Sequence, residues 1–389
     1  MSPSAGIDDL LPSSLLESIR TRAAVHDAEN SFAQDDLDDL AASGYLLAML
    51  PQELGGSDWG FGQTIAAQRR LAAHAPGTAL AVNMHLVWTG VDRVLRALGD
   101  DRLSGMRHAV ARGERLAFGV SEPGNKAMLF DSFTTAEPLE NGDFELTGTK
   151  VFTSMGPGWT RLGVFGKTGE GDDARLIHGF IPRQPGVRTG SDWDALGMRA
   201  SGSASTRLDR ALLKAEDVHS LMAVGEKTDP LIFGIFAAFL SLTGSVYAGV
   251  ADRAVELAAQ NLSGRTDRST GNALAADELL RFGLSDTAMD VLLLDDASVA
   301  LASDLDDLGR ATSPKDPSWF PRLVTFRTRA GDVAREATAT ALRVSGGSSY
   351  SRGSEAERLF RDAAASSFHP SDAESAHRTV ADWLLGPRG

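Results

Sequence analysis

The 389-residue chain contains no cysteine. Disulfide bonds, thiolate metal sites and a cysteine nucleophile are therefore excluded, and a reducing compartment is permitted. Residues 1–14 also lack the basic region and the apolar stretch that make a secretory signal peptide. We therefore expect a cytoplasmic protein.

Positive charge is scarce. The chain has 38 Lys and Arg residues against 52 Asp and Glu residues, which gives a formal net charge of −14. Because binding to nucleic-acid phosphates needs a basic face, this balance argues against a nucleic-acid partner. Small molecules or other proteins are the expected ligands.

Several common catalytic signatures are missing. The sequence has no GxGxxG dinucleotide motif, no P-loop, no HExxH and no GxSxG, and its eight histidines form no recognisable metal motif. A Rossmann enzyme and a metalloenzyme are therefore not expected.

Only one apolar run is long enough to cross a membrane. Residues 231–250 include no charged side chain over twenty positions. The run contains glycine, serine and threonine and has no flanking arginine cluster, and Asp229 and Pro230 suit the start of a helix. We expect a helix buried in a bundle rather than a membrane span.

The hydrophobic period divides the chain into three regions. Apolar residues recur at helical spacing to about residue 112, alternate in short runs from about 117 to 220, and return to helical spacing after 223. The pattern predicts a mostly α protein with an N-terminal helical domain (1–116), a β-barrel domain (117–222) and a C-terminal four-helix bundle (223–389). Long helices are expected at 275–309 and 319–344, and Asn141-Gly142 predicts a type I′ hairpin turn.

Four stretches in a fixed order resemble the acyl-CoA dehydrogenase superfamily of flavoproteins. The resemblance covers nearly the whole chain and implies the same three-domain fold, with FAD as cofactor, FMN as the alternative, and a homotetramer or homodimer. The stretches are "AFGVSEPGNK" (117–126), "LTGTKVFTSMG" (146–156), "ALGMRASGSASTRL" (195–208) and "SGGSSYSRGSEAERLFRDA" (345–363).

The resemblance assigns three residues to the flavin ring. It implies that Ser121 covers the pyrimidine, that Phe152 lies against the ring system and that the Ser154 hydroxyl bonds N5. These types suit the task, because a tricyclic ring needs a flat apolar neighbour and N5 gains from a donor in its plane. The ordinary alternatives are a core aromatic and a hydroxyl bonded to the backbone.

Three further residues are assigned to the rest of the cofactor. The resemblance implies that Gly346 and Gly347 approach the pyrophosphate of FAD or the adenine side of a neighbouring subunit, and the residue type alone equally suits a helix C-cap. Arg268, with Arg265 nearby, lies roughly where relatives place an arginine that reaches a partner's flavin. A solvated loop is the alternative for both arginines.

The pattern departs from the dehydrogenases at the catalytic base. In the dehydrogenases a glutamate removes the substrate proton. When the sequences are matched from the Arg361-Asp362-Ala363 stretch, that glutamate falls on Pro370. Some relatives carry the glutamate in the first bundle helix instead, at a position that falls near Phe239. Neither residue is an acid, so no carboxylate is present at these positions to remove the substrate proton. "GNKAM" after Pro123 also replaces the segment that contacts CoA in relatives, so CoA binding is in question.

Two histidines suggest a different chemistry. His369 follows "RDA" after a short spacer and His85 lies in the second helical segment, an arrangement that resembles reduced-flavin monooxygenases of this fold. The ordinary pKa of histidine, near 6.5, suits the proton transfers that accompany the reaction of reduced flavin with oxygen. A capping role for His369 and a core role for His85 are the alternatives.

Taken as a sequence, the chain is interpreted as a flavin-dependent oxidoreductase acting on a small or carrier-bound substrate. Monooxygenation with reduced flavin from a separate reductase is placed ahead of dehydrogenation of an acyl thioester by a non-standard base. A non-catalytic subunit of a hetero-oligomeric dehydrogenase is the third hypothesis.

Overall fold

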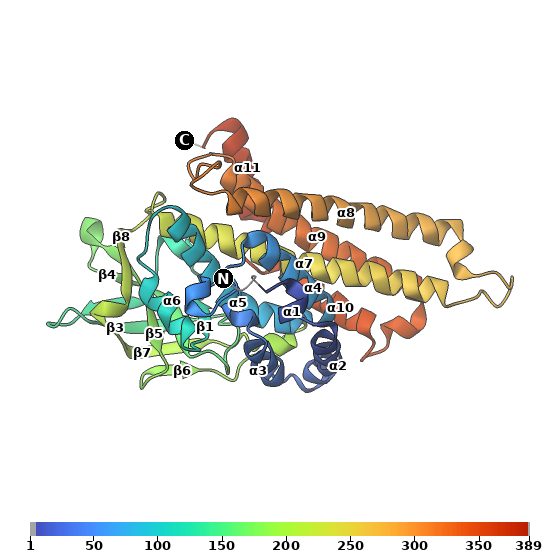
Figure 1. The fold of residues 1–389 in the computed structure, drawn as a ribbon, viewed down its shortest axis with the longest axis horizontal. Helices are drawn as coiled ribbons and strands as arrows, with labels where there is room; N and C mark the ends of the chain where they lie inside the picture. Colours follow the sequence, from blue (N-terminus) through green and yellow to red (C-terminus); the bar gives the residue numbers. More distant parts are fainter. Residues whose placement is uncertain (1–4, 388–389) are drawn as a thin grey trace.

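The long apolar run forms one helix, α7 (Pro230–Ser263), in the middle of the protein. The computed structural model describes residues 5–387 (Figure 1). As predicted, the Asp229 carboxylate caps the helix by accepting a hydrogen bond from the Leu231 backbone N–H at 2.8 Å. Although α7 is long and apolar enough to span a membrane, 94% of its most apolar window is buried inside the protein. Its hydrophobic surface therefore belongs to the core.

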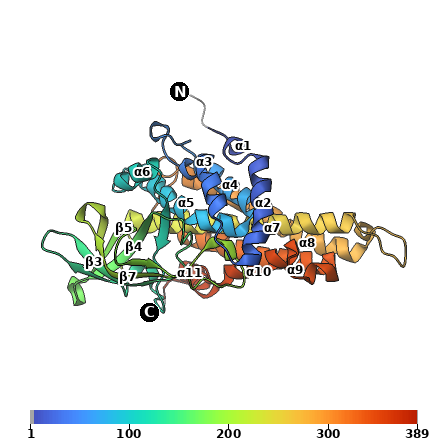
Figure 2. The same cartoon turned by 90° about the horizontal axis from the view of Figure 1, so that it is seen from below.

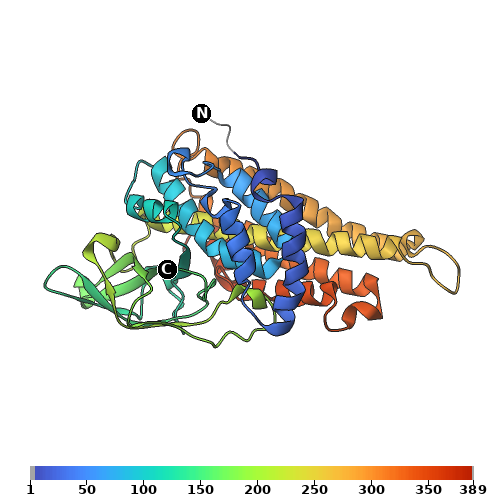
Figure 3. The ribbon, with the colours of Figure 1, turned by 60° about the horizontal axis from the view of Figure 1, so that its bottom comes forward.

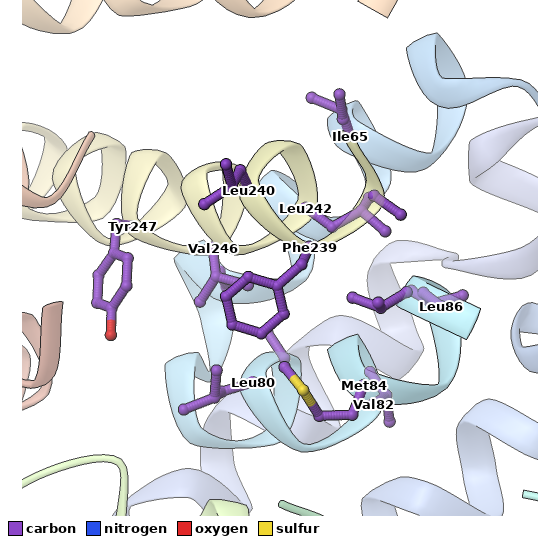
Figure 4. Close-up of a cluster of buried hydrophobic side chains, with 14 of the residues drawn as sticks. Ile65, Leu80, Val82, Met84, Leu86, Phe239, Leu240, Leu242, Val246 and Tyr247 are labelled. Atoms are coloured by element: carbon purple, nitrogen blue, oxygen red, sulfur yellow. The ribbon is translucent and has the colours of Figure 1, made fainter. Parts of the chain in front are cut away.

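Helices from both ends of the chain pack around α7. Helices α4 and α5 of the N-terminal region contact it on one side, and α8 and α9 of the C-terminal region contact it as well. Figure 4 shows Phe239 of α7 directed toward Met84 of α5 within the shared apolar cluster. The two helical regions therefore have one common core. The N-terminal helices are α1 (Ile7–Leu10), α2 (Ser13–Glu29), α3 (Gln34–Ala42), α4 (Phe61–His74), α5 (Pro76–Ala97) and α6 (Ser104–Ala111).

The C-terminal region is a helical bundle, as predicted. Helices α8 (Glu278–Asp306) and α9 (Trp319–Ser345) confirm the two long helices expected there. Helix α10 (Glu355–Ala364) contacts both α7 and α9, and α11 (Ala373–Leu385) contacts α9. Figure 3 shows the long helices extending away from the sheet, with the N-terminal helices lying across them.

The middle region is an eight-stranded sheet at one end of the helical body (Figure 2). The strand order is β6-β7-β3-β2-β4-β5-β8, and β1 pairs with β4. In the part of the chain that is described, β6 and β8 do not pair with each other, so hydrogen bonds do not close the expected barrel. The domain boundaries expected near residues 116 and 222 stay predictions. The strands are β1 (Leu116–Gly119), β2 (Thr135–Pro138), β3 (Phe144–Lys150), β4 (Arg161–Thr168), β5 (Arg175–Pro182), β6 (Val187–Thr189), β7 (Thr206–Leu213) and β8 (Val218–Ala223).

The turn between β2 and β3 differs from the predicted type I′. Gly142 has a left-handed φ of 87°, whereas Asn141 is not among the described residues with positive φ. The Gly142 N–H donates to the Leu139 carbonyl at 3.0 Å, and the Asn141 side chain bonds Asp143 at 2.8 Å. The loop is therefore a five-residue connection with one left-handed glycine. A type I′ turn needs a left-handed backbone at residues 141 and 142, and the local hydrogen bond between Asn141 and Asp143 competes with that conformation at Asn141.

Trp88 of α5 docks the helical region onto the sheet. Its indole N–H donates to the Ala117 carbonyl at 3.0 Å, and its ring lies 4.9 Å from the rings of His178 and Phe180. Gly163 of β4 lies directly under the indole, where an added Cβ would come within 2.4 Å of Trp88 Cζ2. The strand can approach the helix this closely because residue 163 has no side chain.

We expect Gly163→Ala to lower the free energy of unfolding by about 1–3 kcal/mol, since a fully buried indole must shift to admit the methyl group. Urea denaturation followed by tryptophan fluorescence measures the change. Gly105→Ala in α6 is the matched control, because a Cβ there meets no atom within 4 Å, and it should leave stability unchanged or slightly higher. Equal effects of the two substitutions would contradict this account of the docking.

Candidate active site

A buried ion pair joins two of the sequence stretches singled out above. Lys150, at the end of β3, is fully buried, and its Nζ donates to Glu122 Oε1 at 2.7 Å. The remaining lone pairs of Glu122 accept hydrogen bonds from the Phe133 N–H at 2.7 Å and from Thr134 Oγ1 at 2.6 Å. Lys150 also donates to the Phe165 carbonyl at 2.7 Å. Such a fully bonded pair satisfies the charges that burial removes from water.

Both members of this pair are charged at neutral pH. Burial alone would raise the pKa of Glu122, but the Lys150 charge and the hydrogen bonds to the carboxylate lower it to about 2. Burial lowers the pKa of Lys150 to about 8, and the attraction of Glu122 opposes that shift. A carboxylate and an ammonium group therefore hold the two stretches together.

The pair holds the stretch of Ser121 against the stretch of Ser154. Ser121 precedes Glu122, and its carbonyl accepts a hydrogen bond from the Val151 N–H at 2.9 Å. Ser154, three residues after Val151, is almost fully buried, and its hydroxyl lies 2.9 Å from the hydroxyl of Ser203. Two stretches that are apart in the sequence are therefore joined through the backbone as well as through the ion pair.

Phe152 is unusual beside these serines. Its backbone is left-handed, with φ of 56°, and its ring is 57% exposed. Among residues 5–387, its ring contact is an edge-on one with Trp193, at 6.4 Å between centroids. A bulky residue held in a strained conformation with an uncovered ring is typical of a ligand contact, so Phe152 offers a flat apolar surface to a ring-shaped molecule.

An apolar cavity lies beside Ser121. Phe239 and Pro370, the two positions at which the resemblance places a glutamate, both line it. No lining residue carries a carboxylate, so the cavity has no group of the kind that removes a proton from an acyl thioester. The lining residues are Phe118, Val120, Ser121, Met128, Leu129, Ile235, Phe236, Phe239, Leu240, Pro370 and Ser371.

The third and fourth stretches meet through Asp362 and Arg361. Asp362 is buried and accepts a hydrogen bond from the Met198 N–H at 2.5 Å, and Arg361 donates to the Leu196 carbonyl at 2.8 Å. Gly197 lies between them, where a Cβ would come within 2.2 Å of the Arg361 carbonyl oxygen. This contact fixes the start of the segment that leads to Pro370.

His369 precedes Pro370 and is bonded within the protein. Its Nδ1 lies 2.6 Å from the Tyr247 hydroxyl and 3.1 Å from the Ala365 carbonyl, and its own carbonyl accepts from Arg327 Nη2 at 2.8 Å. Burial and the nearby Arg327 charge lower the pKa of His369 to about 4. The imidazole is therefore neutral at pH 7. The cavity lining includes its neighbour Pro370 but not His369 itself.

His85 has a structural environment instead. It is fully buried, its Nε2 lies 2.7 Å from the Leu46 carbonyl, and its Nδ1 accepts from the Leu116 N–H at 3.1 Å. Burial lowers its pKa to about 4. Because both ring nitrogens bond the backbone, the geometry does not support the predicted catalytic role, and His85 joins α5 to β1 and to the segment around Leu46.

Gly346, Gly347 and Arg268 are not brought to this site within one chain. Gly346 follows α9 with φ of 75°, next to the Arg265 guanidinium, and Arg268 is exposed in the connection between α7 and α8. Figure 1 places both segments at the opposite end of the bundle from the sheet. Their predicted contact with a flavin stays a prediction and would require a second copy of the chain.

The sequence argument missed four residues of the site. Glu122 and Lys150 lie inside the stretches quoted from the sequence. Lys150 is on the same face of β3 as the buried Leu146, and a charged residue on an apolar strand face indicates a buried ion pair. Tyr247 and Arg327 gave no such signal, because each meets His369 only through the tertiary fold. Residues 5–387 contain no cluster of three or more His, Asp or Glu side chains that could hold a metal ion.

Comparison with known families agrees with this geometry. Residues 13–102 match "Acyl-CoA dehydrogenase, N-terminal domain", and residues 241–371 match "Acyl-CoA dehydrogenase, C-terminal domain". The chain belongs to the acyl-CoA dehydrogenase family. The resemblance inferred from the four stretches and the fold that it implied, two helical regions around a middle sheet, are both confirmed.

Several similar proteins are named as nitrososynthases or monooxygenases. L-evernosamine nitrososynthase of Micromonospora sp. is 28% identical over 377 residues, which are 92% of this chain and 85% of that protein. Dibenzothiophene monooxygenase of Mycolicibacterium goodii is 26% identical over 264 residues, 61% of this chain and 58% of that protein. The solved structure of KijD3 in complex with FMN and dTDP-3-amino-2,3,6-trideoxy-4-keto-3-methyl-D-glucose is 25% identical, with a TM-score of 0.85 over 97% of this chain and 92% of that one.

We expect Lys150→Met to lower the free energy of unfolding by about 3–5 kcal/mol, because Glu122 would stay buried without its counter-ion. The double variant Glu122→Gln/Lys150→Met removes both charges and should recover part of the loss. Urea denaturation at pH 7.5 measures both. Lys214→Met is the control, since Lys214 pairs with Glu216 in solvent at 3.4 Å and should change stability by less than about 1 kcal/mol. A similar loss in Lys150→Met and in the control would refute the role of the pair.

Proposed function

We propose that the protein is a flavin-dependent monooxygenase that uses reduced flavin and dioxygen to oxidise a small organic molecule. The observation that carries this proposal is the cavity beside Ser121, which contains Phe239 and Pro370 at the two glutamate positions and has no carboxylate in its lining. Without a carboxylate base, dehydrogenation of an acyl thioester lacks its first step. The names of the nitrososynthase and monooxygenase relatives support the same choice.

The site fits a flavin ring. The exposed ring of Phe152 would lie against the isoalloxazine, while Ser121 and the Ser154 hydroxyl would meet its polar edge. A bound flavin supplies the electron transfer and oxygen chemistry that protein side chains lack. The chain's own residues would hold the ring beside the apolar cavity that Phe239 and Pro370 line.

We place FMN ahead of the FAD first expected. Gly346 and Gly347 are expected to approach the pyrophosphate of FAD or the adenine side of a neighbouring subunit, and Arg268 to reach a partner's flavin. FMN has no adenosine half and needs none of these contacts. The KijD3 structure holds FMN. FAD is the alternative, and it would be completed by a second copy of the chain.

The expected partners follow from the same features. No GxGxxG motif is present to bind a nicotinamide cofactor, so a separate flavin reductase would supply the electrons. Helix α8 carries a row of exposed apolar side chains, which supports a homotetramer or homodimer. These residues are Leu279, Phe282, Met289, Leu292, Leu293 and Val299.

His369 would donate or accept the proton that is transferred in the reaction with oxygen. Its lowered pKa keeps the ring neutral at pH 7, so the imidazole offers one N–H donor and one basic nitrogen rather than a fixed positive charge. A neutral imidazole can hydrogen-bond an oxygen atom without protonating it early. Such positioned proton donors and acceptors contribute about 10²- to 10⁴-fold to catalysis.

We expect reduced, flavin-loaded protein mixed with oxygen to regain the oxidised-flavin absorbance slowly, through an intermediate spectrum. His369→Ala should shorten the lifetime of that intermediate by at least about 100-fold. Stopped-flow absorbance measures both. His377→Ala is the matched control, because His377 is an exposed histidine on α11 bonded only to the Ala373 carbonyl among the described residues.

Direct single-step reoxidation in the wild-type protein would contradict the proposal and favour a dehydrogenase with a non-standard base. A colourless protein that copurifies with a glutamate-bearing homologue would instead favour a non-catalytic subunit of a hetero-oligomeric dehydrogenase.

A further inference from the structure

Tyr247 and His369 form a partly buried side-chain pair that the sequence did not reveal. Tyr247, on α7, is fully buried, and its hydroxyl oxygen lies 2.6 Å from His369 Nδ1. The two rings meet edge to face, with centroids 5.7 Å apart. Figure 4 shows the Tyr247 hydroxyl directed away from the apolar cluster that surrounds Phe239.

The hydroxyl proton of Tyr247 has one acceptor. In the part of the chain that is described, the Tyr247 hydroxyl makes no hydrogen bond other than the one to His369 Nδ1. Burial raises the pKa of Tyr247 far above its usual value, so the phenol keeps its proton at any ordinary pH. A buried O–H group without an acceptor would cost about 1–3 kcal/mol.

His369 Nδ1 has a second neighbour, a backbone carbonyl, which can accept a hydrogen bond but cannot donate one. The Ala365 carbonyl lies 3.1 Å from Nδ1, and this carbonyl already accepts a hydrogen bond from the Phe368 N–H at 3.0 Å. If Nδ1 carried the histidine proton, it would donate to that carbonyl and leave the Tyr247 O–H unsatisfied. If Nδ1 is bare, it accepts from Tyr247, and every one of these groups has a partner.

We propose that Tyr247 is a positioning residue that donates a hydrogen bond to His369 Nδ1 and thereby holds the imidazole in the tautomer with its proton on Nε2. Within residues 5–387 no protein atom bonds Nε2, so this N–H is free for a ligand or water. Arg327, which binds the Ser366 and His369 carbonyls at 2.6 and 2.8 Å, fixes the backbone that carries the ring.

The catalytic part of this inference rests on the proposed function. There, His369 donates a hydrogen bond from Nε2 to an oxygen atom bound near Pro370, and Tyr247 acts only through His369. The Tyr247 hydroxyl keeps its proton and no bond is broken in this step, so the tyrosine sets which nitrogen is the donor. The assignment of the tautomer itself depends on no flavin chemistry.

Nitrogen NMR tests the tautomer directly. In protein labelled with 15N-histidine, a long-range 1H–15N correlation spectrum distinguishes the protonated ring nitrogen from the bare one, and His369→Gln identifies the signals of His369 among the eight histidines. We expect a bare Nδ1 and a protonated Nε2 in the wild-type protein. In Tyr247→Phe, Nδ1 loses its donor and should become protonated in a large fraction of molecules, donating to the Ala365 carbonyl.

Tyr45→Phe is the matched control, because Tyr45 is equally buried but bonds Gln68 at 2.8 Å and should leave the His369 signals unchanged. A protonated Nδ1 in the wild-type protein would overturn the proposal, whether or not the Tyr247 variant folds. An unchanged tautomer in a folded Tyr247→Phe would overturn it too.

The oxygen reaction separates this inference from the proposed function. With a long-lived intermediate in the wild-type protein, Tyr247→Phe should shorten its lifetime by at least about tenfold. If the tautomer changes as expected but the wild-type protein shows no intermediate, then the assignment of Tyr247 stands and the monooxygenase proposal fails. An intermediate with an unchanged lifetime in Tyr247→Phe would overturn the catalytic part alone.

Discussion

Two opposite charges that are removed from water must stay together, and in this protein Glu122 and Lys150 lie on the two stretches that carry the candidate flavin residues. Replacing such a pair with apolar residues can be harmless, but separating it leaves a bare charge in the core. The 2.7 Å contact therefore fixes the end of β1 against the end of β3. Ser121 is next to Glu122 in the sequence, and Phe152 and Ser154 follow Lys150 closely. The ion pair therefore determines how these three residues are placed relative to one another.

Helix α7 supplies the other wall of the site and changes its chemistry. Phe239 and Leu240 close the cavity where relatives place an acid, and Tyr247, two turns further along, reaches His369. The wall is therefore apolar where a dehydrogenase needs charge, and the polar groups are neutral because burial lowers the pKa of the histidine and raises that of the tyrosine.

The sequence was informative where local rules decide the structure. The cap at Asp229 and the apolar period predicted α7, α8 and α9, and ordered motifs predicted the family and the carboxylate-free positions. It was wrong about the turn at Asn141, where a local side-chain bond accompanies a different conformation. The catalytic role expected of His85 stays a prediction, and both of its ring nitrogens bond backbone groups of distant segments. The pairing of Tyr247 with His369, 122 residues apart, depends on how α7 packs against the C-terminal loop, which no local pattern encodes.

The cavity lining contains no carboxylate that could serve as the base of acyl thioester oxidation. To check that such oxidation does not occur, the oxidised, flavin-loaded protein is mixed anaerobically with saturated acyl-CoA thioesters of several chain lengths, and the flavin absorbance is followed. The absorbance should stay that of oxidised flavin, because no carboxylate is available at residue 239 or 370 to remove the substrate proton. Rapid bleaching of the flavin by any of these thioesters would show that the protein has another base and is a dehydrogenase.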